Sequence, residues 1–134
     1  MEKKEFTLDF ITSLKENEVF VFGSNLQGAH GGGAAAIANK KFGAEWGVGV
    51  GMTGQCYAIP TMQGGVGTIK PYVDEFIHYA SEHQEKTFLV TRIGCGIAGF
   101  TDAEIAPLFR DALPLENVTL PKSFVDVLTK TFGI

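Results

Sequence analysis

The class of fold is decided by the stretch VFVFGSN at residues 19–25. Its four leading residues are β-branched or aromatic and a glycine follows at once, which is typical of a strand covered on both faces. The stretch FLVTRI at residues 88–93 has the same character and also runs into glycines. Shorter strands are predicted at residues 56–59, before Pro60, and at residues 117–120.

Helical patterns lie between these strands. Residues 34–42 consist mostly of helix formers and precede a glycine, a natural C-cap. Apolar residues recur at helical spacing from residue 69 to residue 80. A capping box formed by Thr101 and Glu104 opens another helix, which runs to about residue 113 and in which Pro107 predicts either a kink or a first turn that restarts there.

Three segments have weaker patterns. Residues 44–54 are rich in glycine and predict a loop or an irregular edge. The apolar residues of segment 7–14 have helical spacing and favour a short helix, although those between residues 6 and 10 also alternate as in a strand. A looser capping box at Ser123 and Asp126 predicts the start of a final helix.

Strands and helices alternate along all 134 residues, about the length of one domain, and no repeat or linker interrupts them. We therefore expect a single domain over residues 1–134. Its predicted fold is a three-layer α/β/α arrangement around a mixed, largely parallel central sheet.

The composition argues against several classes of function. Fifteen acidic residues against eleven basic ones give a net charge of −4, so nucleic-acid binding is not expected. No apolar run approaches the ~20 residues of a membrane span, and residues 1–5 lack the apolar stretch of a signal peptide. We expect a soluble, cytoplasmic protein. Neither the two cysteines, Cys56 and Cys95, nor the three histidines have metal-ligand spacing, so neither a metal nor a cofactor is expected.

Glycines concentrate where two of the strands end. The segment GAHGGG at residues 28–33 precedes the alanine-rich helix, and GCGIAG at residues 94–99 follows the strand at 88–93. Ligands of α/β sheets bind beyond the carboxyl ends of the strands, so both loops are expected to line one crevice. The free N–H groups at a helix start suit a phosphate, and the simplest interpretation is a pyrophosphate held between the loops. The alternative is that the glycines only make tight turns.

Two common nucleotide-binding motifs do not account for these loops. Gly94, Gly96 and Gly99 match the dinucleotide fingerprint literally, but the predicted helix begins only after the last glycine, which argues against a Rossmann site. The phosphate-binding pattern GxxxxGK[ST] is absent from the sequence.

Three side chains in or beside the loops have a chemical role to consider. His30 is interpreted either as an acid, a base or a phosphate donor, or as a solvated loop residue. Cys95 is either a nucleophile whose pKa is lowered by backbone N–H groups, or, as we favour, a small buried hydrophobe. Arg92 is expected either to pair with an anion or to lie beside a carboxylate.

These motifs resemble those of macrodomains, which bind ADP-ribose, over roughly residues 18–113. The chain is more narrowly similar to a group of small bacterial and phage proteins that carry its VFGSN stretch. Asn25 matches the asparagine that follows a macrodomain's first core strand, and residues 31–33 match the glycines that lead its helix. Residues 93–100 match its second glycine loop. The resemblance implies that the loops hold the diphosphate and the distal ribose, and that Asn25 contacts that ribose.

The ligand-binding residues expected from the two loops and from the resemblance are Asn25, Gly28, Gly31, Gly32, Gly33, Gly94, Cys95, Gly96, Ile97, Ala98, Gly99 and Phe100. The chain departs from the family at two points. It lacks the upstream Gly-Asp-Ile motif whose acidic residue recognises adenine, a motif that Asp9 does not match. Ala98 replaces the aromatic residue that orients the distal ribose in members that remove ADP-ribose.

The sequence therefore predicts a domain that binds ADP-ribose or a related NAD-derived nucleotide, either free or attached to a macromolecule. One alternative is a hydrolase of an ADP-ribosyl linkage, in which Asn25 positions a water or a ribose hydroxyl and His30 assists. A weaker alternative is an enzyme that depends on Cys95. The exact ligand and the oligomeric state are left open.

Overall fold

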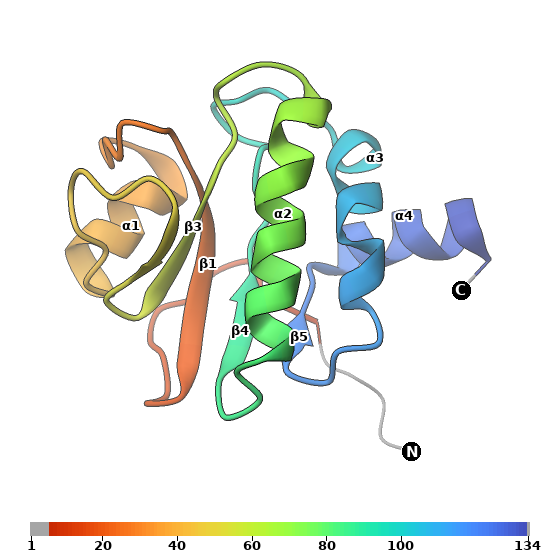
Figure 1. The fold of residues 1–134 in the computed structure, drawn as a ribbon, viewed down its shortest axis with the longest axis horizontal. Helices are drawn as coiled ribbons and strands as arrows, with labels where there is room; N and C mark the ends of the chain where they lie inside the picture. The colour runs from red at the N-terminus through yellow and green to blue at the C-terminus, as the bar shows by residue number, and fades with distance from the viewer. Residues whose placement is uncertain (1–5, 134) are drawn as a thin grey trace.

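The computed structural model describes residues 6–133. Residues 1–5, on which part of the expectation about a signal peptide rests, and residue 134 lie outside the described residues. The elements follow one another from the amino end to the carboxyl end as labelled in Figure 1. They are β1 (Glu18–Ser24), α1 (Gly33–Lys41), β2 (Gly51–Thr53), β3 (Cys56–Pro60), α2 (Val66–Ser81), β4 (Thr87–Val90), α3 (Asp102–Ile105), the 3₁₀ segment η1 (Ala106–Ala112), β5 (Val118–Thr119) and α4 (Lys122–Phe132).

The sheet has five strands in the order β2-β3-β1-β4-β5. Strand β1 pairs in parallel with β3 and β4, and β4 pairs in parallel with β5. Strand β2 is antiparallel to β3 at the edge, so part of the irregular segment 44–54 belongs to the sheet. The predicted mixed, largely parallel sheet is confirmed.

Helices cover both faces of the sheet because β1 is apolar on both sides. Val19 and Val21 belong to a core cluster with residues of α2, η1 and α4. Phe20 and Phe22 point to the other face and pack with residues of α1. Figure 1 shows α1 and α2 on either side of the strands. Among the described residues, no helix has the length and apolar character needed to span a bilayer.

The order of the strands opens a crevice beside the end of β1. The chain passes from β1 through α1 to β3 on one side, and then crosses through α2 to β4 on the other side. Right-handed crossovers in opposite directions place their helices on opposite faces. The loops that follow β1 and β4 therefore leave the sheet toward opposite faces, and ligands of α/β proteins bind at such a point.

Three expectations about the elements were wrong in detail. The short helix in segment 7–14 is absent: the Thr7 N–H donates to the Leu120 carbonyl at 3.0 Å, and Phe10 is 87% exposed rather than buried on a helix face. Strand β4 ends at Val90 instead of residue 93, because the Ile93 N–H bonds the Thr91 carbonyl at 2.7 Å and turns the chain.

The third correction concerns the start of α4. No side chain caps this helix, which begins directly after Pro121. Instead of closing a capping box, the Ser123 hydroxyl donates to the Asp102 carboxylate at 3.1 Å, and Asp126 pairs with Lys122. The capping box of Thr101 and Glu104 is confirmed. Of the two alternatives at Pro107, the structure has the restart: α3 ends at Ile105, and the 3₁₀ segment η1 follows with Pro107 in its first turn.

Candidate functional site

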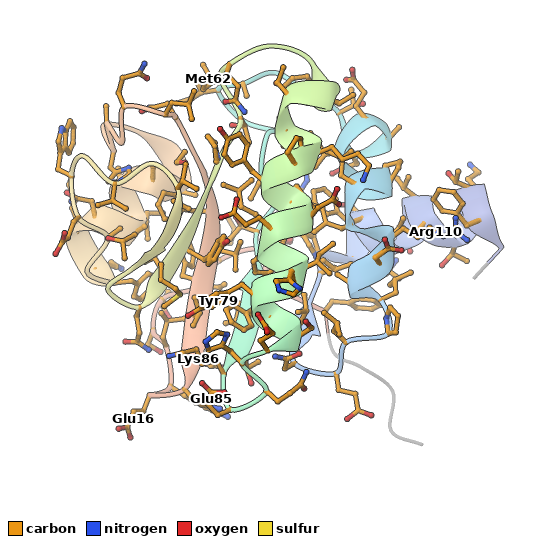
Figure 2. The ribbon with its side chains drawn as sticks, viewed as in Figure 1. Glu16, Met62, Tyr79, Glu85, Lys86 and Arg110 are labelled. Atoms are coloured by element: carbon orange, nitrogen blue, oxygen red, sulfur yellow. The ribbon has the colours of Figure 1, made fainter. Side chains whose placement is uncertain are left out.

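A cavity of about 320 Å³ lies beyond the carboxyl ends of β1, β3 and β4. Its walls are the two glycine-rich loops, the first turn of α1, and the residues that follow β3. Met62, one of these residues, lies at the opposite end of the molecule from Glu16 and Glu85 (Figure 2). The volume is at the lower end of the range of about 300–1,000 Å³ for small-molecule sites.

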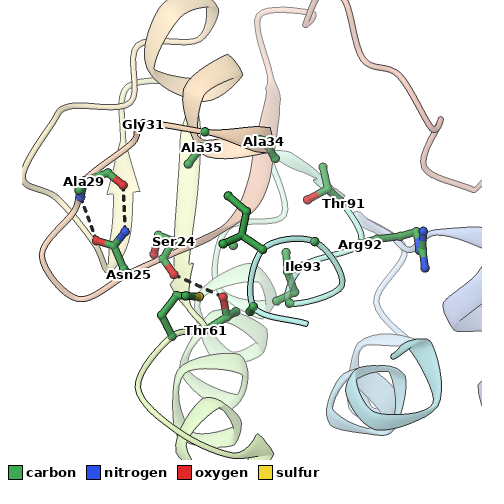
Figure 3. A pocket seen from close by; sticks show the side chains of 18 residues that line it. Ser24, Asn25, Ala29, Gly31, Ala34, Ala35, Thr61, Thr91, Arg92 and Ile93 are labelled. Carbon is green, nitrogen blue, oxygen red and sulfur yellow. Dashed lines mark hydrogen bonds between the residues drawn. The ribbon is translucent and has the colours of Figure 1, made fainter. Parts of the chain in front are cut away.

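The first loop is closed by Asn25. Its side-chain oxygen accepts from the Ala29 N–H, and its side-chain nitrogen donates to the Ala29 carbonyl, both at 2.9 Å (Figure 3). Gly28 belongs to the same turn, with a φ of 70°, and a Cβ there would lie 2.3 Å from the Gly47 carbonyl carbon. Gly28 is therefore required for packing against segment 43–50 and does not line the cavity.

His30 belongs to the first loop, and its side chain is buried between this loop and segment 43–50. Its side chain is 2% exposed, Nε2 donates to the Glu45 carbonyl at 2.8 Å, and the ring makes edge contacts with Phe22 and Trp46. His30 does not line the cavity, so it is neither the solvated loop residue nor a side chain presented to a ligand. Its interactions hold the loop against segment 43–50.

The glycines at residues 31–33 lead the chain from this loop into α1. Gly32 is the N-cap and offers no side-chain cap, and Gly33 has a φ of 58°. The first N–H groups of a helix have no intrahelical acceptor, and the helix dipole adds a partial positive charge at this end. Gly32 and Gly33 thus expose the amino end of α1 to the cavity without a side chain in between.

The second loop forms the facing wall. Gly94 has a φ of 75°, and a Cβ there would lie 3.0 Å from the Ile105 side chain, so this glycine allows the loop to pack on α3. Gly96, Ile97 and Ala98 line the cavity, and the Ile97 side chain is 77% exposed. The Phe100 side chain packs against the core instead.

Cys95 belongs to this loop but lines the second cavity described below rather than the first. Its Sγ lies 3.7 Å from Asp102 Oδ1, and burial, together with the Asp102 charge, raises the pKa of the thiol to about 11. The nucleophile hypothesis required a lowered pKa, so this direction argues against it. The favoured interpretation of Cys95 as a small buried hydrophobe stays a prediction, and the residue is partly rather than fully buried.

A second, larger cavity of about 740 Å³ adjoins the first. The two share five lining residues: Gly33, Ala34, Thr91, Arg92 and Gly96. Its outer wall is segment 7–12, which includes Asp9 and the exposed ring of Phe10, and its charged lining residues are Asp9, Lys41 and Arg92. The sequence did not predict this cavity, because the pattern of the segment that builds it favoured a short helix rather than a cavity wall.

The first cavity brings together most of the predicted residues. Those that line it are Asn25, Gly31, Gly32, Gly33, Gly94, Gly96, Ile97 and Ala98, whereas Gly28, His30, Cys95, Gly99 and Phe100 do not. Met62 and the α1 residues Ala34 and Ala35 line it without having been predicted. A hydrophobic residue after a strand and alanines in a helix are core signals, so their sequence positions alone do not mark them as site residues.

The chemistry available in the first cavity is narrow. Of the described residues that line it, Arg92 alone is charged, and none is Asp, Glu, His, Lys, Cys or Tyr. Nor does any group of three His, Cys, Asp or Glu side chains within residues 6–133 converge as a metal site would. Such a cavity suits an anion held by backbone N–H groups, and it lacks a side chain that exchanges protons near neutral pH.

Comparisons of the chain with protein-family models, with curated proteins and with solved structures found no match.

Proposed function

We propose that the protein has a macrodomain fold and binds ADP-ribose or a related NAD-derived nucleotide, free or attached to a macromolecule. One observation carries the proposal: two glycine loops meet at the exposed amino end of α1, around a cavity whose only charged lining residue, among those described, is Arg92. In a chain with fifteen acidic and eleven basic residues, this end of the sheet is the place that favours an anion.

The size of the cavities supports a ligand with two parts. The first cavity holds a diphosphate and a ribose, but its volume of about 320 Å³ is small for a whole dinucleotide-like molecule. The second cavity gives room for the base, beside the exposed ring of Phe10 and the carboxylate of Asp9. A ligand that passes from one cavity to the other places its phosphates at the amino end of α1.

We propose binding rather than hydrolysis because the described residues that line the first cavity offer no side chain for general acid–base catalysis at the reacting bond. His30 is turned into the protein, and Cys95 lines only the second cavity as a thiol with a raised pKa. The protein should release no ADP-ribose from an ADP-ribosylated protein above background. Release that His30→Ala abolishes would establish the hydrolase instead.

Calorimetry with ADP-ribose, ATP and GTP tests the proposal. ADP-ribose is expected to bind with measurable heat and the triphosphates poorly, because both glycine loops line one cavity of about 320 Å³ and no triphosphate motif is present in the sequence. Equal binding of all three nucleotides, or binding of none, would contradict it.

A further inference from the structure

Arg92 lies where the two cavities meet. It is the only charged residue among the five that line both. A ligand that extends from one cavity into the other passes the shared lining residues, which include Arg92. The head of that side chain is engaged elsewhere, and Figure 3 shows it extending away from the first cavity.

The partner that holds Arg92 is Asp102, the first residue of α3. Nε donates to Oδ1 at 3.0 Å and Nη2 donates to Oδ2 at 2.9 Å, so the two groups form a paired, fork-like contact. The Arg92 side chain is 53% exposed and that of Asp102 25%. Ion pairs with this much contact with water contribute less than buried ones, but the paired geometry makes this pair one of the stronger exposed cases, so a ligand of higher charge is needed to replace Asp102.

The two partners differ in what they lose when the pair opens. Asp102 keeps the Ser123 hydroxyl at 3.1 Å and the Cys95 Sγ at 3.7 Å, and its carboxylate also lies favourably in the first turn of a helix. The hydrogen bonds of the Arg92 guanidinium to described residues all go to Asp102. Asp102 Oδ1 thus keeps two partners when the pair opens and Oδ2 loses the Arg92 Nη2, whereas the guanidinium loses both of its bonds and needs another anion.

We propose that the phosphates of the bound nucleotide replace Asp102 as the partner of the Arg92 guanidinium. Asp102 is then an internal competitor that holds Arg92 until a sufficiently charged ligand spans both cavities. A diphosphate carries more charge than a carboxylate and offers the paired oxygens that a guanidinium recognises. This inference rests on the proposed function, and it adds a residue that selects for charge at the junction of the cavities.

A double-mutant cycle measured by calorimetry with ADP-ribose tests the exchange. Arg92→Gln should weaken binding about tenfold, as expected for lost hydrogen bonds to a charged group. Asp102→Asn retains an oxygen for Ser123 and removes the competing charge, so binding should strengthen about threefold. This gain in affinity must vanish when Arg92→Gln is also present, because the double variant has no arginine side chain that could leave position 102 and bind the phosphates.

The matched controls make the same charge changes away from the cavities. Arg110→Gln removes a guanidinium that lies over the Phe132 ring at 4.4 Å (Figure 2), and Asp126→Asn removes the partner of Lys122 on α4. Both should bind ADP-ribose as the wild type does. Melting curves of all variants establish that they are folded.

The outcomes separate this inference from the proposed function. If the wild type binds ADP-ribose and Arg92→Gln binds it as well as Arg110→Gln does, the exchange is wrong and the proposed function survives. A gain from Asp102→Asn that persists in the double variant would be a general charge effect and would also overturn it. If the wild type does not bind ADP-ribose, both fail. If Asp102→Asn does not fold, the affinity of Arg92→Gln for ADP-ribose, compared with that of Arg110→Gln, decides whether the exchange occurs.

Discussion

The Asn25 side chain makes two hydrogen bonds with the backbone of Ala29, each of 2.9 Å, and so closes the loop that carries the chain from β1 to the amino end of α1. These bonds use one N–H and one lone pair of the side-chain amide, so a second N–H and a second lone pair are left for the ribose contact expected for Asn25. Asn25 therefore has a structural role whether or not it contacts a ligand.

Asn25→Ala should lower the free energy of unfolding by about 1–2 kcal/mol, because it removes two hydrogen bonds and leaves both Ala29 backbone groups to find other partners. Urea denaturation followed by circular dichroism measures the change. Gln84→Ala, which removes one exposed bond to the Ser81 carbonyl at 3.0 Å, is the control and should have little effect. Equal stabilities of the two variants would contradict the loop-closing role.

Gly49→Ala should destabilise the protein by about 2 kcal/mol or more, because its Cβ would lie 2.1 Å from the Asn25 carbonyl oxygen, which belongs to the backbone and cannot move aside cheaply. Gly67→Ala is the opposite case. A Cβ there meets nothing within 4 Å in the first turn of α2, so a gain of about 0.5–1 kcal/mol is expected. Thermal and urea unfolding should place the two variants on opposite sides of the wild type.

Gly32→Glu should weaken ADP-ribose binding at least tenfold, about 1.4 kcal/mol, because it adds a carboxylate at the N-cap of α1, where a phosphate is expected. The nearest atom to the new Cβ is the end of the exposed Ile97 side chain at 3.3 Å, which has room to move, so the fold should be retained. Gly65→Glu makes the same change at the N-cap of α2, outside both cavities, and should leave binding unchanged. If a folded Gly32→Glu variant bound ADP-ribose with unaltered affinity, the phosphates would not bind at the amino end of α1.

Cys95 should react slowly with a thiol reagent at neutral pH, since burial raises its pKa to about 11 and only the thiolate is reactive. The rate in a Cys56→Ala background should rise as the pH increases toward 11, and Cys95→Ser in that background should abolish it. Binding of ADP-ribose should survive Cys95→Ser, because the serine side chain is as small and can still donate a hydrogen bond to Asp102. Fast modification that is already complete at pH 7 would instead indicate a lowered pKa.

The sequence alone predicted strands β1, β3, β4 and β5, helices α1, α2 and α4, the interruption at Pro107 and the position of both glycine loops, but not strand β2. These features depend on local chemistry: residue type, spacing and the backbone freedom of glycine. The wrong predictions also came from local patterns. The apolar residues of segment 7–14 have helical spacing, but a helix is stable only when its apolar face packs against another part of the protein. The Thr7 N–H instead donates to the carbonyl of Leu120, just after β5.

What the tertiary structure decided is where each loop side chain points and what it contacts. His30 lies between glycines in the sequence, yet its ring is buried because segment 43–50 folds back to present the Glu45 carbonyl and Trp46. The link between Arg92 and Asp102 likewise depends on how the second loop turns onto α3. Residue type and spacing determine which backbone can form, whereas the partner of a polar side chain depends on contacts between segments that only folding brings together.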